Sequence, residues 1–177
     1  MKAADAMVEQ WDALWGSFHE AAHAVVARRL GMRVEKVTMT YTRVPHPLYK
    51  SLDDERNLDR LVVSCAGDAA TLVLCGGWTQ IERPGGDDGN SLDRLEYLGA
   101  TKSQADEMLK AARDVSAIHC DELRNEIWNV ADELRANGEL NEAQLDEAIS
   151  EAGYVNWKKH AAHVQMFREY FEKHPKF

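Results

Sequence analysis

The chain has 177 residues, of which 45% are hydrophobic and 29% charged, an ordinary balance for a globular protein that buries its own core. Its formal net charge of −9 disfavours nucleic acids and anionic membrane surfaces as partners, because both attract basic faces. The three cysteines form no C-x-x-C pair, the N-terminus does not resemble a secretory signal, and no stretch reaches the roughly 18 apolar residues of a membrane span. We therefore expect one soluble, cytoplasmic domain over residues 1–177.

Helical periodicity dominates the first part of the chain. Residues 4–15 and 17–30 show the spacing of two short helices, with apolar side chains recurring every three or four residues. Gly16 is expected to end the first helix and Ser17 to cap the second. The near alternation of apolar and polar residues over 33–42 then predicts a strand.

The remainder is predicted to be helical around one long loop. A helix with a nearly apolar second half is expected over 52–75, and five glycines and one proline then predict a loop over 75–91. Further helices are expected from about residue 91, over 103–136 as one long or two abutting helices, over 141–152 with Asn141 as its cap, and over 155–173, with a break at Gly138. The predicted class is mainly α with one small β element.

The second predicted helix carries His19, Glu20 and His23 in the pattern H-E-x-x-H. Residues four apart lie on one helical face, about 5–6 Å apart between their Cβ atoms, so both imidazoles can bind one Zn²⁺ ion. Glu20 lies at the edge of that face, where it can take a proton from a zinc-bound water. A competing interpretation treats Ser17 and Glu20 as a capping box, in which the glutamate turns back to the Ser17 amide.

A catalytic zinc usually takes three protein ligands and a water. The metzincin spacing would place a third histidine where this chain has Arg29, so that class is excluded. An acid on the following predicted helix, Asp53, Asp54 or Glu55, is one candidate for the third ligand.

Two blocks of the sequence resemble the FtsH-type zinc peptidases. Residues 17–39, SFHEAAHAVVARRLGMRVEKVTM, are similar to that family's H-E-A-G-H-A-V-V segment and the strand that follows it. Residues 64–77, SCAGDAATLVLCGG, resemble its second block, a helix of the G-G-x-A-A-E-E type. The resemblance spans roughly residues 15–100, without the family's AAA ATPase module or membrane helices. It implies a compact helical zincin-like peptidase domain that stands alone.

The resemblance also points to a third zinc ligand, because the family keeps an aspartate at the helix start that corresponds to residues 84–98. In the closest register Ser91 occupies that position, and serine is a poor zinc ligand. Asp88 and Asp87 lie three and four residues earlier, on the same face if the helix extends back that far. Asp93 lies about 200° away from Ser91 and is the weaker candidate. We therefore expect His19, His23 and Asp88 as ligands.

A second departure concerns the acids that follow the family's paired alanines. This chain has Thr71 and Leu72 there, and Asp68 is the candidate to substitute for those acids, although it is out of register. If those acids orient a ligating histidine, their loss weakens the site, commonly by about 10- to 100-fold.

Two functions follow from these patterns. The first is a zinc metallopeptidase that hydrolyses unstructured polypeptide segments with Glu20 as general base, its substrate pairing with the edge of the strand over 34–41. Folded targets would require a separate unfoldase or regulatory protein. The alternative is a catalytically weak or inactive pseudopeptidase that acts as a protein-interaction module, which the altered positions Ser91, Thr71 and Leu72 favour.

Overall fold

The structure is a computed structural model that describes residues 2–44, 51–52, 54, 56–75, 87–152, 161–162 and 165. This part of the chain is mainly helical and includes a small three-stranded antiparallel sheet, which confirms the expected class. None of its helices combines the length and the apolar character that crossing a membrane requires. The expected loop over 75–91 and the expected helix over 155–173 lie largely outside the described residues. The end of that loop is an exception, because the helix α4 (Asp87–Tyr97) begins at Asp87 and not near residue 91 as expected.

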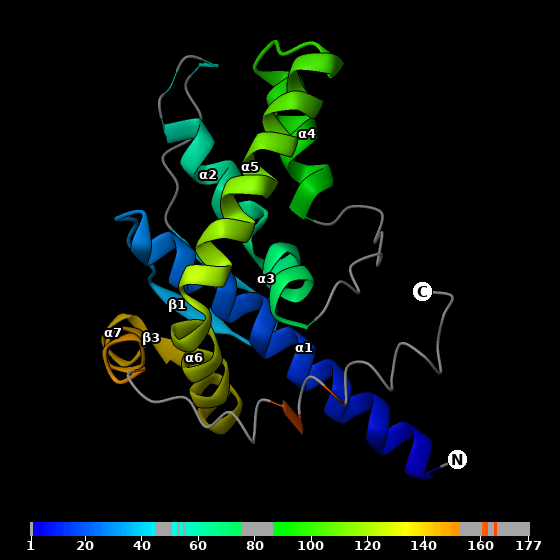
Figure 1. Ribbon diagram of the computed structural model, residues 1–177, viewed down its shortest axis with the longest axis vertical. Coiled ribbons are helices and arrows are strands. Elements are labelled where there is room, and N and C mark those ends of the chain that lie inside the picture. The colour runs from blue at the N-terminus through cyan, green and yellow to red at the C-terminus, as the bar shows by residue number, and fades with distance from the viewer. Residues whose placement is uncertain are drawn as a thin grey trace.

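The long first helix contacts helices from both halves of the chain and strands of the sheet. The elements follow in the order α1 (Lys2–Arg29), β1 (Lys36–Thr38), β2 (Thr42–Arg43), α2 (Arg56–Ser64), α3 (Ala66–Cys75), α4 (Asp87–Tyr97), α5 (Lys102–Glu122), α6 (Arg124–Asn137), β3 (Glu139–Asn141) and α7 (Glu142–Ser150). Figure 1 shows α1 crossing the view diagonally, with α2, α3 and the α4–α5 pair to one side and α6, β3 and α7 to the other. The second half of α1 is therefore packed among helices from both halves of the chain.

Helix α1 is continuous, so the expected break at Gly16 and cap at Ser17 are wrong. The Ser17 hydroxyl donates to the Leu14 carbonyl oxygen at 2.9 Å, a bond within the helix. Glycine inside a helix costs up to about 1 kcal/mol relative to alanine. Here it admits a neighbour, because a Cβ on Gly16 would lie 2.6 Å from the Met39 carbonyl oxygen. The residue that was expected to end a helix instead lets the turn after β1 contact α1.

The single strand predicted over 33–42 is wrong in part, because a turn divides this stretch into a hairpin of two short strands. Its two strands, β1 and β2, pair antiparallel with Val37 opposite Thr42, and β1 pairs on its other side with β3, where Val37 faces Leu140. The Thr38 hydroxyl accepts the Tyr41 amide at 3.1 Å and so supports the turn between β1 and β2. Because β1 is the central strand, the expectation that a substrate pairs with its edge is wrong. The outer strands of the sheet are β2 and β3.

The predicted helix over 52–75 is divided at Cys65 into α2 and α3. Helical hydrogen bonds cross the division, since the Cys65 amide donates to the Leu61 carbonyl and the Ala69 amide donates to the Cys65 carbonyl, each at 2.9 Å. The predicted helical stretch over 103–136 likewise consists of two abutting helices, α5 and α6, which meet at Leu123. In both cases the apolar pattern identifies the helical stretch, and the division falls at one residue.

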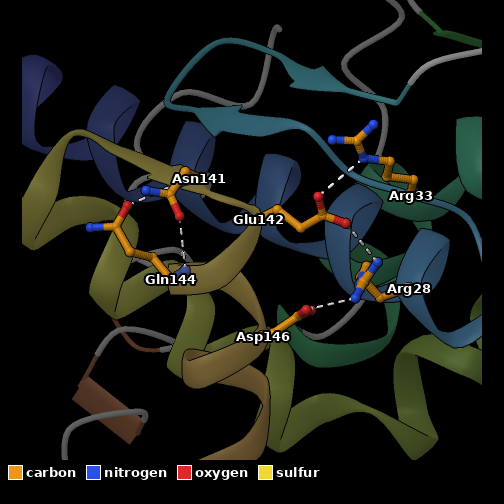
Figure 2. A network of polar contacts seen from close by, with 6 residues as sticks. All are labelled: Arg28, Arg33, Asn141, Glu142, Gln144 and Asp146. Carbon is orange, nitrogen blue, oxygen red and sulfur yellow. Dashed lines mark hydrogen bonds and ion pairs between the residues drawn. The ribbon is translucent and has the colours of Figure 1, made fainter.

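Sequence signals at the start of α7 are confirmed. Gly138 ends α6 with a positive φ of 79°, a conformation that glycine adopts without strain. The Asn141 side chain accepts the Gln144 amide at 3.1 Å, and the Gln144 side chain accepts the Asn141 amide at 3.0 Å (Figure 2). This capping box satisfies amide groups that the first turn of a helix leaves without helical partners.

A network of charged side chains ties α7 to the end of α1 (Figure 2). Arg28 donates to Asp146 at 2.7 Å and to Glu142 at 3.4 Å, and Arg33 donates to the other oxygen of Glu142 at 3.1 Å. These side chains are partly or largely exposed, so each pair is expected to contribute at most about 1 kcal/mol. The network therefore links α7 to the end of α1 through pairs that are individually weak.

Candidate metal centre

The three residues of the H-E-x-x-H pattern lie in the second half of α1. His19, Glu20 and His23 are each only 8% exposed, and the helix around them is lined by small side chains such as Ala21, Ala22 and Ala24, which are fully buried. A buried ionisable group requires a partner, because its desolvation is otherwise unfavourable. The contacts of the three side chains therefore indicate what the site can hold.

The tautomer of His23 is set by the backbone of α2. Its Nδ1 lies 2.6 Å from the Val63 carbonyl oxygen. A carbonyl oxygen can only accept a hydrogen bond, so Nδ1 carries the hydrogen and Nε2 presents its lone pair. Histidine ligands of metals are commonly fixed in this way, with one ring nitrogen donating to an oxygen and the other facing the metal.

The lone pair of His23 points at His19, because the two Nε2 atoms lie 3.1 Å apart and the rings meet edge to face. Two zinc–nitrogen bonds at a tetrahedral angle would place the nitrogens about 3.3 Å apart. A hydrogen bond between the rings has a similar length, so the separation admits either a proton or a metal ion between the two nitrogens. Both imidazoles thus present the same atom to a common point, which suits Zn²⁺.

The His19 ring is enclosed by α1 and α3. Trp15, one turn earlier in α1, stacks on it with ring centroids 4.6 Å apart and planes inclined by 29°. From α3, Gly67 approaches so closely that a Cβ there would lie 2.3 Å from His19 Nδ1 and 2.5 Å from Nε2. The next residue, Asp68, places a carboxylate oxygen 3.8 Å from His19 Nδ1.

Glu20 is held from the sheet. The Thr42 hydroxyl oxygen in β2 lies 2.8 Å from Glu20 Oε2 and 2.9 Å from the Glu20 carbonyl oxygen, and it can donate its hydrogen to either. Because Ser17 lies within the helix, the capping-box interpretation of Ser17 and Glu20 is wrong. The carboxylate is directed toward β2, at the border between α1 and the sheet.

The side chain of Asp88, the expected third ligand, lies outside the described part, as does that of Asp87. Helix α4 begins at Asp87, so it extends back through both residues, as their place on one face with Ser91 requires. Asp88 precedes the buried Leu95 by about two turns and so has nearly the same position around the helix. Asp93, the weaker candidate, is exposed.

Of the three acids before α2, the described one is Asp54, and its carboxylate contacts arginines. Asp54 accepts the Arg56 amide at 3.0 Å and pairs with Arg60 at 3.4 Å, and the bond from Arg56 is the main reason that the pKa of Asp54 is lowered. Asp53 and Glu55 lie outside the described residues. Within the part of the chain that the structure describes, no three His, Cys, Asp or Glu side chains gather to hold a metal ion.

The altered second block also has defined contacts. The Thr71 hydroxyl donates to the Gly67 carbonyl oxygen at 3.1 Å, within α3. Leu72 is largely exposed. The acid beside a histidine is instead Asp68, which the register of the resemblance did not place there.

The sequence did not predict the groups that contact His23 and Glu20, which are the Val63 carbonyl and the Thr42 hydroxyl. The Val63 carbonyl is a backbone group, the same in any residue, so no residue type indicates its role. Thr42 comes from a strand 22 residues beyond Glu20, and its hydroxyl looks like that of any strand threonine. Among the neighbours of the motif, Asp68 carried a signal, as the acid nearest to the family's acidic positions, and Gly67 interrupts an apolar helical pattern.

Comparison with known proteins adds no assignment to this geometry. No protein-family model matches the chain, and no curated protein matches it. The case for a function therefore rests on the side chains of the site.

Proposed function

We propose that the protein is a zinc metallopeptidase of the FtsH type, with a zincin-like arrangement around α1. His19 and His23 would hold Zn²⁺ with Asp88 as third ligand, and Glu20 would be the general base. One observation carries the proposal: the Nε2 atoms of His19 and His23 face each other at 3.1 Å, and a buried carboxylate adjoins them in the helix. The donor set of two imidazoles and one carboxylate is that of several zinc hydrolases.

The residues of the chain have distinct roles in this proposal. Zinc, when bound, would supply the Lewis acidity that polarises a peptide carbonyl. Glu20 takes a proton from the attacking water and delivers it to the departing amine, so the protons balance over the reaction. Thr42 directs the carboxylate by its contact at 2.8 Å. The hydrogen bond from His23 Nδ1 to Val63 keeps that ring in the ligating tautomer.

The proposed substrate is an unstructured polypeptide segment. Glu20 and both histidines lie within a packed helix, so a peptide bond reaches them most readily in an extended chain. The outer strand β2 carries Thr42 onto Glu20, and an extended peptide beside β2 would pass the base. Folded targets would depend on a separate unfoldase or regulatory partner.

Zinc content tests the metal site. Elemental analysis of the purified protein, supplied with zinc and then desalted, should find one zinc per chain. His23→Ala should lose the metal, and Asp88→Asn should weaken its binding. His119→Ala in α5 is the matched control and should keep the wild-type zinc content. A wild-type chain that takes up no zinc would contradict the proposal and favour the interaction-module alternative.

Cleavage of casein tests the proposed base. Glu20→Gln preserves the shape of the side chain but removes its basicity, so it should keep zinc and lose activity by roughly 10²- to 10⁴-fold. Glu107→Gln, which removes an exposed charge on α5, should leave both properties unchanged. Unchanged cleavage by Glu20→Gln would exclude this mechanism. Zinc binding without cleavage by the wild type would indicate the pseudopeptidase.

A further inference from the structure

The two histidines of the site differ in what holds their outer nitrogen. His23 Nδ1 has the Val63 carbonyl oxygen at 2.6 Å, a backbone group that substitution leaves in place. His19 Nδ1 faces a side chain, the carboxylate of Asp68, at 3.8 Å. A ligating imidazole generally needs an acceptor at this position, because the acceptor fixes both the tautomer and the direction of the ring.

The start of α3 explains how Asp68 reaches this position. Asp68 lies in the first turn of the helix, where an acid is favoured by the helix dipole. Gly67, immediately before it, has no side chain to separate α3 from the His19 ring. The Asp68 side chain is 52% exposed, which leaves it room to rotate from ion-pair distance toward a hydrogen bond with Nδ1.

Two further described groups near His19, Trp15 and Thr71, do not offer it a carboxylate. Trp15 stacks on the ring face and offers no acceptor for the Nδ1 hydrogen. The Thr71 hydroxyl, at the position where the resemblance implies an acid, donates within α3 to Gly67. The carboxylate beside the His19 imidazole is therefore that of Asp68, three residues before Thr71.

We propose that Asp68 is the positioning residue of His19. Its carboxylate accepts the Nδ1 hydrogen of His19, so that Nε2 presents its lone pair to the point that His23 Nε2 also faces. The inference rests on the proposed zinc site and adds to it a residue that touches neither metal nor substrate. In this way the chain has an acid beside a ligand although it lacks the acids of the family's second block.

The test compares Asp68→Ala and Asp68→Asn with Asp106→Ala and Asp106→Asn in the full chain. Asp106 is an exposed acid near the start of α5 and controls for the change in net charge. Zinc affinity is measured by competition with a chromophoric chelator. Loss of such an acceptor commonly weakens affinity about 10- to 100-fold, and the exposure of Asp68 places the expected loss at the lower end, roughly tenfold.

A second measurement separates positioning from general damage. In the zinc-loaded protein, ¹⁵N-resolved NMR follows how fast the Nδ1 hydrogen of each histidine exchanges with water. Exchange at His19 should become faster in Asp68→Ala, while the Nδ1 hydrogen of His23, held by Val63, should be unaffected. The free energy of unfolding without zinc should match that of the Asp106 variants.

The outcomes distinguish this inference from the proposed function. If the wild type binds no zinc, the proposed function fails and the inference fails with it. If the wild type binds zinc but the Asp68 variants bind it equally well, with unchanged exchange at His19, only the inference fails. Weaker zinc binding together with faster exchange confined to His19 would support it. Equal acceleration at both histidines would indicate general loosening and overturn it.

Discussion

Gly67 leaves the space that the His19 ring occupies. A Cβ at this position would lie within 2.5 Å of three ring atoms, far inside van der Waals contact. We expect Gly67→Ala to displace the imidazole, weaken zinc binding by at least about tenfold, and lower the free energy of unfolding by about 1–3 kcal/mol. Chelator competition and urea unfolding measure the two effects.

A double variant shows whether the ring is the cause. In a His19→Ala background the three nearest atoms are gone, and alanine is a better helix former than glycine by up to about 1 kcal/mol. Gly67→Ala should therefore be neutral or stabilising in that background. Equal losses of stability in both backgrounds would show that the strain lies elsewhere, because independent sites contribute additively.

At this scale the sequence predicted that the two histidines lie on one helical face but not which groups surround them. The spacing of His19 and His23 predicts a shared helical face, and their Nε2 atoms do meet. Val63 and Thr42 bond to these side chains from other elements, and Asp68 lies 3.8 Å from His19 Nδ1, through contacts that tertiary packing creates. Helical periodicity describes neighbours along one helix and carries no information on which residues pack across from it.

At the scale of elements, sequence signals correctly predicted those helix ends that depend on hydrogen bonds within one turn. The cap at Asn141 and the stop at Gly138 depend on residues within one turn, and both are as expected. Gly16 and Ser17 carry the same kinds of signal, yet α1 continues through them. The contact of Gly16 with Met39 and the packing around Ser17 outweigh a helix-ending preference of about 1 kcal/mol. Sequence patterns therefore predicted the helical content better than the breaks.

The start of α7 allows a cap to be compared with an ion-pair network. Asn141→Ala removes one half of the capping box and should lower the free energy of unfolding by about 1 kcal/mol, with little dependence on salt. Glu142→Gln weakens its pairs with Arg28 and Arg33, which are partly exposed, and should lower it by less than about 1 kcal/mol. That smaller loss should shrink further in high salt, because salt screens charges near the surface.

Urea unfolding at low and high ionic strength measures both changes. Gln144→Ala removes the other half of the capping box and should behave like Asn141→Ala. A loss in Glu142→Gln that exceeds the loss in Asn141→Ala and that high salt reduces would show that the network contributes more than the cap.

At the scale of the whole molecule, the site depends on the packing of α3 against α5. Cys120 of α5 is fully buried, and its thiol donates to the Ala66 carbonyl oxygen at 3.5 Å, at the beginning of α3. Gly67 and Asp68 follow directly, so the same contact helps to place both residues beside His19. Burial raises the pKa of the Cys120 thiol to about 12. The folded chain therefore keeps this thiol protonated at a pH where the unfolded chain does not.

The raised pKa of Cys120 gives stability a defined alkaline dependence. The unfolded thiol titrates near 9.0 and the folded thiol near about 12, so its contribution is intact below pH 9 and declines as the pH rises toward 12. By about pH 10, the free energy of unfolding should have fallen by roughly 1 kcal/mol more in the wild type than in Cys120→Ala. Urea unfolding near pH 8 and pH 10 measures this difference, since other groups titrate equally in both chains. Equal losses in the two chains would mean that the thiol already meets water in the folded state, and that α3 is less firmly packed on α5 than the position of His19 requires.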